Sequence, residues 1–126
     1  MRKYYLFKIK DLKIDLNKTY LILEELFYLN SNKFNYGKTI FENLCLSFNK
    51  EKIIEKLGSN KFVINDLENT IIEVNNTCII IETSKNITKA FKYLNELESN
   101  IFVVDFDNRD YFLLDDFIKL NFKISI

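Results

Sequence analysis

Hydrophobic and polar residues near the start of the chain alternate in a pattern that predicts a β-strand over residues 3–10. Tyr4 and Leu6 share one face of this strand, and Tyr5 and Phe7 share the other. A strand with one face on solvent is polar on that face, so large apolar residues on both faces predict a strand in the interior of the sheet.

A helix is predicted next, over residues 18–29, with Asn17 as its N-cap. Apolar residues spread beyond one face of this helix, since Leu21 and Tyr28 form an i,i+7 pair beside the main apolar stripe. Only three charged side chains interrupt the surface. Such a helix either is buried on most sides or keeps an apolar stripe for a partner.

The connection before that helix is also apolar, because it contains Leu12, Ile14 and Leu16. Connecting segments normally expose polar groups to solvent. Two interpretations stay open here: these residues cover the hydrophobic core, or they contact another protein.

The remaining pattern predicts helices over residues 36–46 and 87–97, and a short helix between Asn49 as N-cap and Gly58 as the residue after its end. The helix over residues 87–97 has a core stripe formed by Ile87, Ala90, Phe91, Leu94 and Leu97. Strands are predicted over residues 61–64, 70–74, 77–83, 101–105, 111–114 and 122–126, with a helical turn at 115–119.

The simplest fold that accommodates these elements is an α/β fold with α+β character. It has a single mixed β-sheet with about four helices packed on it. The chain has 126 residues, of which 48% are hydrophobic, and this suffices for one hydrophobic core. We therefore expect one domain over residues 1–126.

The net charge of the chain points to no particular class of partner. The 18 basic and 18 acidic side chains cancel, so no overall field attracts nucleic acid or an anionic membrane. Charged residues interrupt the apolar start of the chain, which argues against a signal peptide, and no apolar run approaches the roughly 20 residues of a membrane span. We expect a cytoplasmic protein with no direct contact to nucleic acid or membrane.

The inventory of reactive side chains argues against an enzyme. Histidine, the commonest general base, is absent, and the two glycines, Gly37 and Gly58, are too isolated for a phosphate-binding loop. Cys45 and Cys78 lie in apolar runs without metal-ligand spacing, and we interpret them as reduced core residues. We expect no catalytic residue and no cofactor.

One acidic cluster, which includes Asp105, Asp107 and Asp110, offers a less favoured alternative, a site for a hard cation. Arg109 occupies the third ligand position of a calcium-type loop, and no glycine follows it. The spacing therefore favours a turn in which the carboxylates accept hydrogen bonds from the backbone.

Three blocks of the sequence, in order, resemble the sporulation inhibitor of replication (SirA) family. The blocks are Tyr4-Tyr5 followed by Lys10-Asp11; Tyr36-Gly37, Ile40, Leu44-Cys45 and Phe48; and residues 101–108 with 111–114. The resemblance covers most of the chain and implies a cytoplasmic protein of a low-GC Gram-positive bacterium. It also implies binding to the N-terminal domain of the replication initiator DnaA, which restrains initiation of chromosome replication.

The resemblance further implies which segments meet the initiator: the one after the first strand, with the helix that follows, and the next helix. The candidate contact residues are Leu12, Ile14, Leu16, Tyr20, Thr39 and Asn43. The contact segment of the family is aromatic, whereas the one here is aliphatic, so a different protein partner or self-association stays open. We expect a monomer or a weak dimer.

Overall fold

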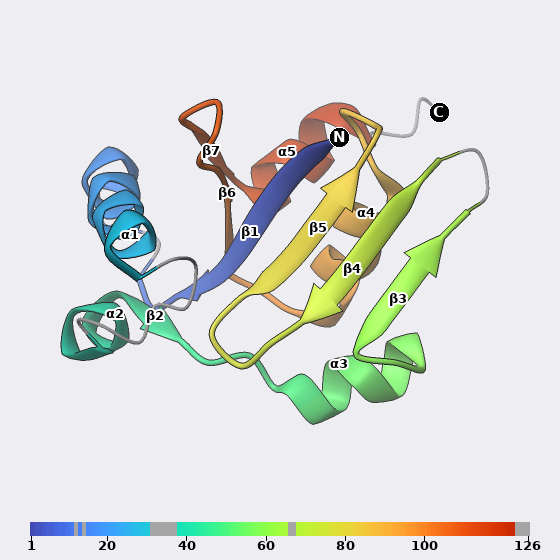
Figure 1. Cartoon of the computed structure of the whole chain (residues 1–126), viewed down its shortest axis with the longest axis horizontal. Helices are drawn as coiled ribbons and strands as arrows, with labels where there is room; N and C mark the ends of the chain where they lie inside the picture. Colours follow the sequence, from blue (N-terminus) through green and yellow to red (C-terminus); the bar gives the residue numbers. More distant parts are fainter. Residues whose placement is uncertain (12, 14, 31–37, 66–67, 123–126) are drawn as a thin grey trace.

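The computed structural model shows an α+β fold, as the sequence predicts (Figure 1). It describes residues 1–11, 13, 15–30, 38–65 and 68–122, and for residues 29–30 and 38–40 the backbone alone. These residues form one sheet of seven strands and five helices.

Six strands follow one another across the sheet in the order β3-β4-β5-β1-β6-β7. Their bounds are Lys61–Ile64 (β3), Thr70–Val74 (β4), Ile79–Thr83 (β5), Arg2–Ile9 (β1), Ile101–Asp105 (β6) and Asp110–Leu113 (β7). The two-residue strand β2, Cys45–Leu46, pairs with the end of β1. Every pairing between described strands is antiparallel, whereas the sequence suggested a mixed sheet. The strands β5 and β6 do run parallel to each other, but β1 lies between them.

The central position of β1 confirms the prediction of an interior strand. Tyr5 pairs with Ile80 of β5 on one side and with Val104 of β6 on the other. Leu6 and Phe7, which point to opposite faces, are both completely buried. Two hydrophobic layers therefore meet at this strand, one on each face of the sheet.

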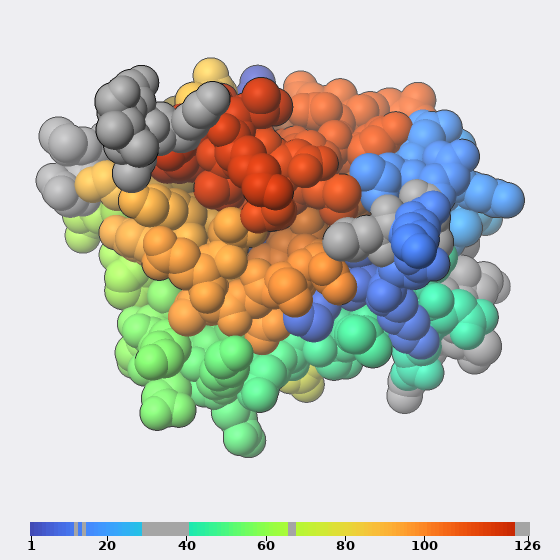
Figure 2. Space-filling model, turned by 180° about the vertical axis from the view of Figure 1, so that it is seen from behind, coloured from blue at the N-terminus to red at the C-terminus, as the bar shows by residue number. Residues whose placement is uncertain are grey.

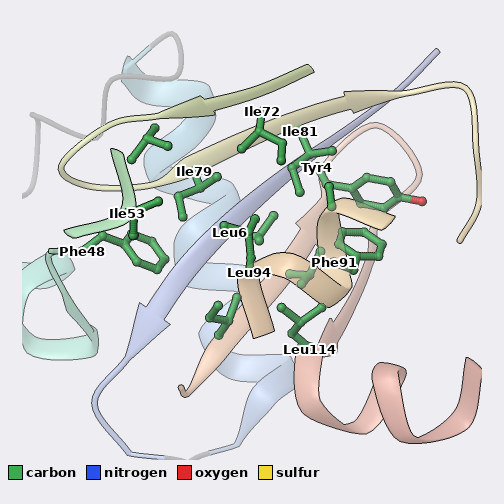
Figure 3. Close-up of a cluster of buried hydrophobic side chains, with 14 of the residues drawn as sticks. Tyr4, Leu6, Phe48, Ile53, Ile72, Ile79, Ile81, Phe91, Leu94 and Leu114 are labelled. Carbon is green, nitrogen blue, oxygen red and sulfur yellow. The ribbon is translucent and has the colours of Figure 1, made fainter. Parts of the chain in front are cut away.

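Three helices cover the first face: α3 (Lys50–Leu57), α4 (Lys89–Leu97) and α5 (Leu114–Asn121). Figure 2 shows α4 and α5 side by side on this side of the molecule. Their apolar residues meet those of the strands in one buried cluster (Figure 3). The labelled members of this cluster are Tyr4, Leu6, Phe48, Ile53, Ile72, Ile79, Ile81, Phe91, Leu94 and Leu114.

The helices α1 (Leu16–Asn30) and α2 (Lys38–Leu44) contribute to the core on the second face. Its centre is aromatic: the rings of Phe27 and Phe106 stack with their centroids 4.2 Å apart, and Tyr5 contacts both. The two helices lie at the side of the sheet that holds β1, β6 and β7, away from β3 (Figure 1). On the far strand β3, Val63 remains 47% exposed.

Side-chain caps set the helix boundaries, and one predicted cap is confirmed while another is wrong. Asn49 caps α3 by accepting a hydrogen bond from the Lys52 N–H, and Gly58 ends it with φ +85°, which suits glycine. At α1, however, the cap is Asp15, whose carboxylate accepts from the Lys18 N–H at 3.2 Å. The helix therefore begins before Asn17.

Two further predictions are corrected near the helix ends. Thr88 caps α4, so Ile87 lies outside that helix and is 45% exposed rather than part of its core stripe. Phe122 closes α5 and does not begin a strand, while the remaining residues of the predicted terminal strand, 123–126, lie outside the described part of the chain.

A buried carboxylate joins β4, β5 and the start of α4. Glu68, 7% exposed, accepts hydrogen bonds from the hydroxyl groups of Thr70 and Thr88 and, at 3.0 Å, from the Lys89 N–H. Thr70 also shares a hydrogen bond of 2.6 Å with Thr83. Burial by itself raises the pKa of Glu68, but these hydrogen bonds outweigh it, so the pKa is lowered.

We predict that Glu68→Gln lowers the free energy of unfolding by about 2 kcal/mol at neutral pH, because charge-assisted hydrogen bonds are replaced by weaker ones. The lowered pKa makes this stabilisation complete above the ordinary pKa of 4.5, and it is lost as the pH falls through the folded-state pKa. Urea unfolding at pH 7 and near pH 3 measures both effects.

The matched control is Glu73→Gln, an exposed glutamate on the strand β4 that follows Glu68, which should change stability by less than about 0.5 kcal/mol. Equal losses in the two variants, or a loss at Glu68 that does not shrink in acid, would contradict the structural role of this carboxylate.

Candidate functional site

The sequence predicted that the apolar helix over residues 18–29 either is buried on most sides or keeps an exposed apolar stripe. In the structure, α1 does carry exposed apolar residues on its outward side. Leu21 is 45% exposed and Tyr28, seven residues later, is 64% exposed. On the opposite side of the helix, Leu23 and Leu26 are buried against the sheet. We call Leu21 and Tyr28 the α1 stripe. The excess of apolar residues in this helix therefore has two parts, one in the core and one on the surface.

A cluster of polar and aromatic contacts fixes α1 to the turn between β6 and β7. The Glu24 carboxylate accepts from Arg109 Nε at 2.9 Å and from a second guanidinium nitrogen at 3.1 Å. Arg109 has φ +53°, a left-handed conformation within the turn. The Tyr20 hydroxyl donates to the same carboxylate, and the Tyr20 ring stacks on Tyr111 with 5.0 Å between centroids. The stripe is thus carried by a helix that is held at its centre.

Tyr20, one of the predicted contact residues, is only 2% exposed in this structure. Burial raises its pKa to about 12, and the hydrogen bond with Glu24 adds to this effect. At neutral pH the phenol therefore keeps its proton and serves as a hydrogen-bond donor inside the protein.

The other predicted contact residues have different positions. Leu16 is half-buried at the start of α1 and packs against the core of the second face, whereas Asn43 is exposed on α2. Leu12 and Ile14 lie outside the described residues, as does the side chain of Thr39. Among the predicted residues whose side chains are described, Asn43 alone is exposed.

The candidate contact residues predicted from the sequence did not include the exposed apolar residues of α1 and β2, which are Leu21, Tyr28 and Leu46. The i,i+7 spacing of Leu21 and Tyr28 was a usable signal for the α1 stripe. Leu46 gave no such signal, because it was expected inside a helix. In the structure it lies on β2, is 44% exposed and pairs with Lys8.

The acidic cluster forms a turn. Asp105 is 2% exposed and accepts hydrogen bonds from the Asn108 N–H at 3.2 Å and from Asn108 Nδ2 at 2.7 Å. The Asp105 carboxylate therefore accepts hydrogen bonds from the turn that joins β6 and β7. Over the described ranges, no three Asp, Glu, Cys or His side chains come together in a way that could hold a metal ion.

A cavity of about 700 Å³ lies between α4, α5 and the end of β1. Most of its polar groups already have partners. Lys8 Nζ is 2.6 Å from Glu98 Oε2, and Lys52 Nζ donates to the Leu97 carbonyl at 3.4 Å. These contacts stabilise the junction of the helices with the sheet.

No family model matches the sequence, and no curated protein is significantly similar to it. Within the described part of the chain, every helix is too short or too polar to cross a bilayer.

We predict that neither thiol reacts in the folded protein. Cys45 and Cys78 are both 2% exposed, and burial raises the pKa of each to about 12, so the reactive thiolate is scarce at neutral pH. A chromogenic disulfide reagent at about pH 8 should therefore label them only at the rate of unfolding. Denaturant is the control, since it should release both thiols at once. Rapid labelling of the native protein would contradict their burial.

Proposed function

We propose that this chain is a protein-binding module that acts by occupying a surface of its partner, and that the α1 stripe is the centre of its contact area. The observation that carries the proposal is the exposure of Leu21 and Tyr28 on a helix whose other side is anchored in the core. Exposed aromatic and aliphatic side chains on a rigid element are typical anchors of protein interfaces.

The surroundings of the stripe support this role. Lys18 and Glu25, on the same helix, are exposed and of opposite charge, so the apolar residues have polar neighbours that do not favour partners of one charge. Interfaces commonly combine an apolar centre with a polar rim. Two side chains give a small area, which favours a weak and reversible complex over a permanent one.

The partner that we propose is the N-terminal domain of the replication initiator DnaA, and the expected effect is inhibition of replication initiation in the cytoplasm. The support is the resemblance of the three sequence blocks to the sporulation inhibitor of replication family. In that family the contacts come from the segment after the first strand with its helix, and from the helix that follows. The corresponding helix here is α1, which carries the exposed stripe.

The proposal needs no catalytic group. The chain has no histidine and thus lacks the commonest general base, which supports action by binding alone.

We predict that the protein binds the purified DnaA N-terminal domain with a Kd of about 50 µM or tighter, which corresponds to about −6 kcal/mol. Leu21→Lys and Tyr28→Ala should each weaken binding by about tenfold, because each removes apolar contact area at the centre of the interface. Calorimetric titration measures these constants, and light scattering of the protein alone detects self-association through the same stripe.

Two variants serve as controls for this titration. Ile87→Lys changes an apolar residue with the same 45% exposure as Leu21, on another part of the surface, and should leave the Kd unchanged. Tyr20→Phe should lower stability by about 1 kcal/mol, through the lost hydrogen bond to Glu24, without changing the Kd. Absence of binding at this concentration would reject the initiator as partner, and a dimer disrupted by Leu21→Lys would assign the stripe to self-association.

A further inference from the structure

A second, smaller cavity of about 210 Å³ lies on the second face of the sheet. Its lining comes from three parts of the chain that are distant in sequence: Lys3 and Tyr5 of β1, Phe27 of α1, and Phe106 and Asp107 of the turn after β6. The volume corresponds to about seven water molecules, which is the size of a small metabolite and below that of most cofactor sites.

The Tyr5 hydroxyl in this lining is an unsatisfied polar group. The side chain is 2% exposed, and its hydroxyl oxygen has no hydrogen-bond partner among the described residues. Burial raises the pKa of Tyr5, and the nearby Lys3 ammonium, 5.6 Å from the ring centroid, offsets part of this effect. A buried donor without a partner costs about 1–3 kcal/mol, so such groups in folded proteins call for an explanation.

The rest of the lining combines apolar walls with two opposite charges. The stacked rings of Phe27 and Phe106 provide an apolar surface next to Tyr5. Lys3 and Asp107 make no ion pair with any residue that the structure describes, in contrast to the paired Lys8 and Glu98 of the larger cavity. A cation, an anion and a hydroxyl donor thus line one small cavity. The Lys3 ammonium lies over the Tyr5 ring, and neither Lys3 nor Asp107 is paired with an opposite charge among the described residues.

We propose that this cavity binds a small zwitterion, namely a free α-amino acid with an apolar side chain. Its carboxylate would bind the Lys3 ammonium and accept the hydrogen bond from the Tyr5 hydroxyl, and its ammonium group would bind Asp107. Its side chain would pack on the rings of Phe27 and Phe106. A ligand with a carboxylate alone meets the repulsion of Asp107, and an amine alone meets the repulsion of Lys3.

L-leucine is the probe that fits this chemistry, and two compounds that each lack one charged group are its controls. 4-Methylpentanoate lacks the ammonium group, and 3-methylbutylamine lacks the carboxylate. We expect L-leucine, titrated to about 20 mM, to give saturable shifts of the backbone amide signals of Lys3, Phe106 and Asp107 in two-dimensional NMR. Each control compound should bind about tenfold more weakly, since it loses one charge-assisted contact.

Variants of the lining test the assigned contacts. Lys3→Met and Asp107→Asn should each weaken L-leucine binding by about tenfold, whereas Lys92→Met, an exposed lysine on α4, should leave it unchanged. Tyr5→Phe should weaken binding by about threefold to tenfold without lowering the melting temperature, because the hydroxyl that it removes has no partner in the fold.

Three results would overturn the proposal: no saturable shift with L-leucine, equal affinity for all three compounds, or unchanged affinity in both Lys3→Met and Asp107→Asn. The test is independent of the proposed interaction with DnaA. Leu21→Lys changes the α1 stripe but none of the cavity lining, so it should lose partner binding and keep the amino-acid response.

Discussion

The burial of β1 on both faces is the constraint on which the rest of the structure depends. Leu6 and Phe7 are adjacent in sequence, point in opposite directions and are both completely removed from solvent. Each such side chain contributes about 1.5–3 kcal/mol only if something covers it, so the sheet requires helices on two sides. The two faces are covered by different numbers of the described helices. The helices α3, α4 and α5 pack on the first face, and α1 and α2 pack on the second.

Sequence pattern predicted those elements whose determinants are local. The helix between Asn49 and Gly58 is an example, because a capping side chain and a left-handed glycine act within one or two turns of the residues that they terminate. Where two local signals compete, pattern alone chose wrongly: Asp15 and Asn17 are both good caps, and Asp15 is the one that accepts the backbone hydrogen bond. Ile87 fits the helical period of α4, but Thr88 begins the helix after it.

The candidate site was predicted less well because its geometry depends on contacts between distant parts of the chain. An apolar helix with several possible faces can lie on a sheet in more than one rotation, and periodicity does not distinguish among them. In this structure the observed rotation of α1 is accompanied by the contact between Glu24 and Arg109, which are 85 residues apart in sequence. It is also accompanied by the stacking of Tyr20 on Tyr111. These contacts turn Tyr20 inward and Leu21 outward, although the two are adjacent in sequence. The sequence of α1 alone therefore does not predict which of its apolar residues face the core.

The same helix then belongs to both proposed sites. Phe27 lines the small cavity, and its ring centroid lies 5.0 Å from that of Tyr28, which belongs to the exposed stripe. A ligand that packs on Phe27 and a partner that packs on Tyr28 would therefore contact two rings that touch each other. Coupling between the sites requires that the ligand bind more tightly to one arrangement of these rings than to another, and that the partner discriminate between the same two arrangements. The stacking of Phe27 on Phe106 opposes such movement, because moving either ring removes apolar contacts in the core of the second face. The geometry thus favours two sites that share a helix but act independently.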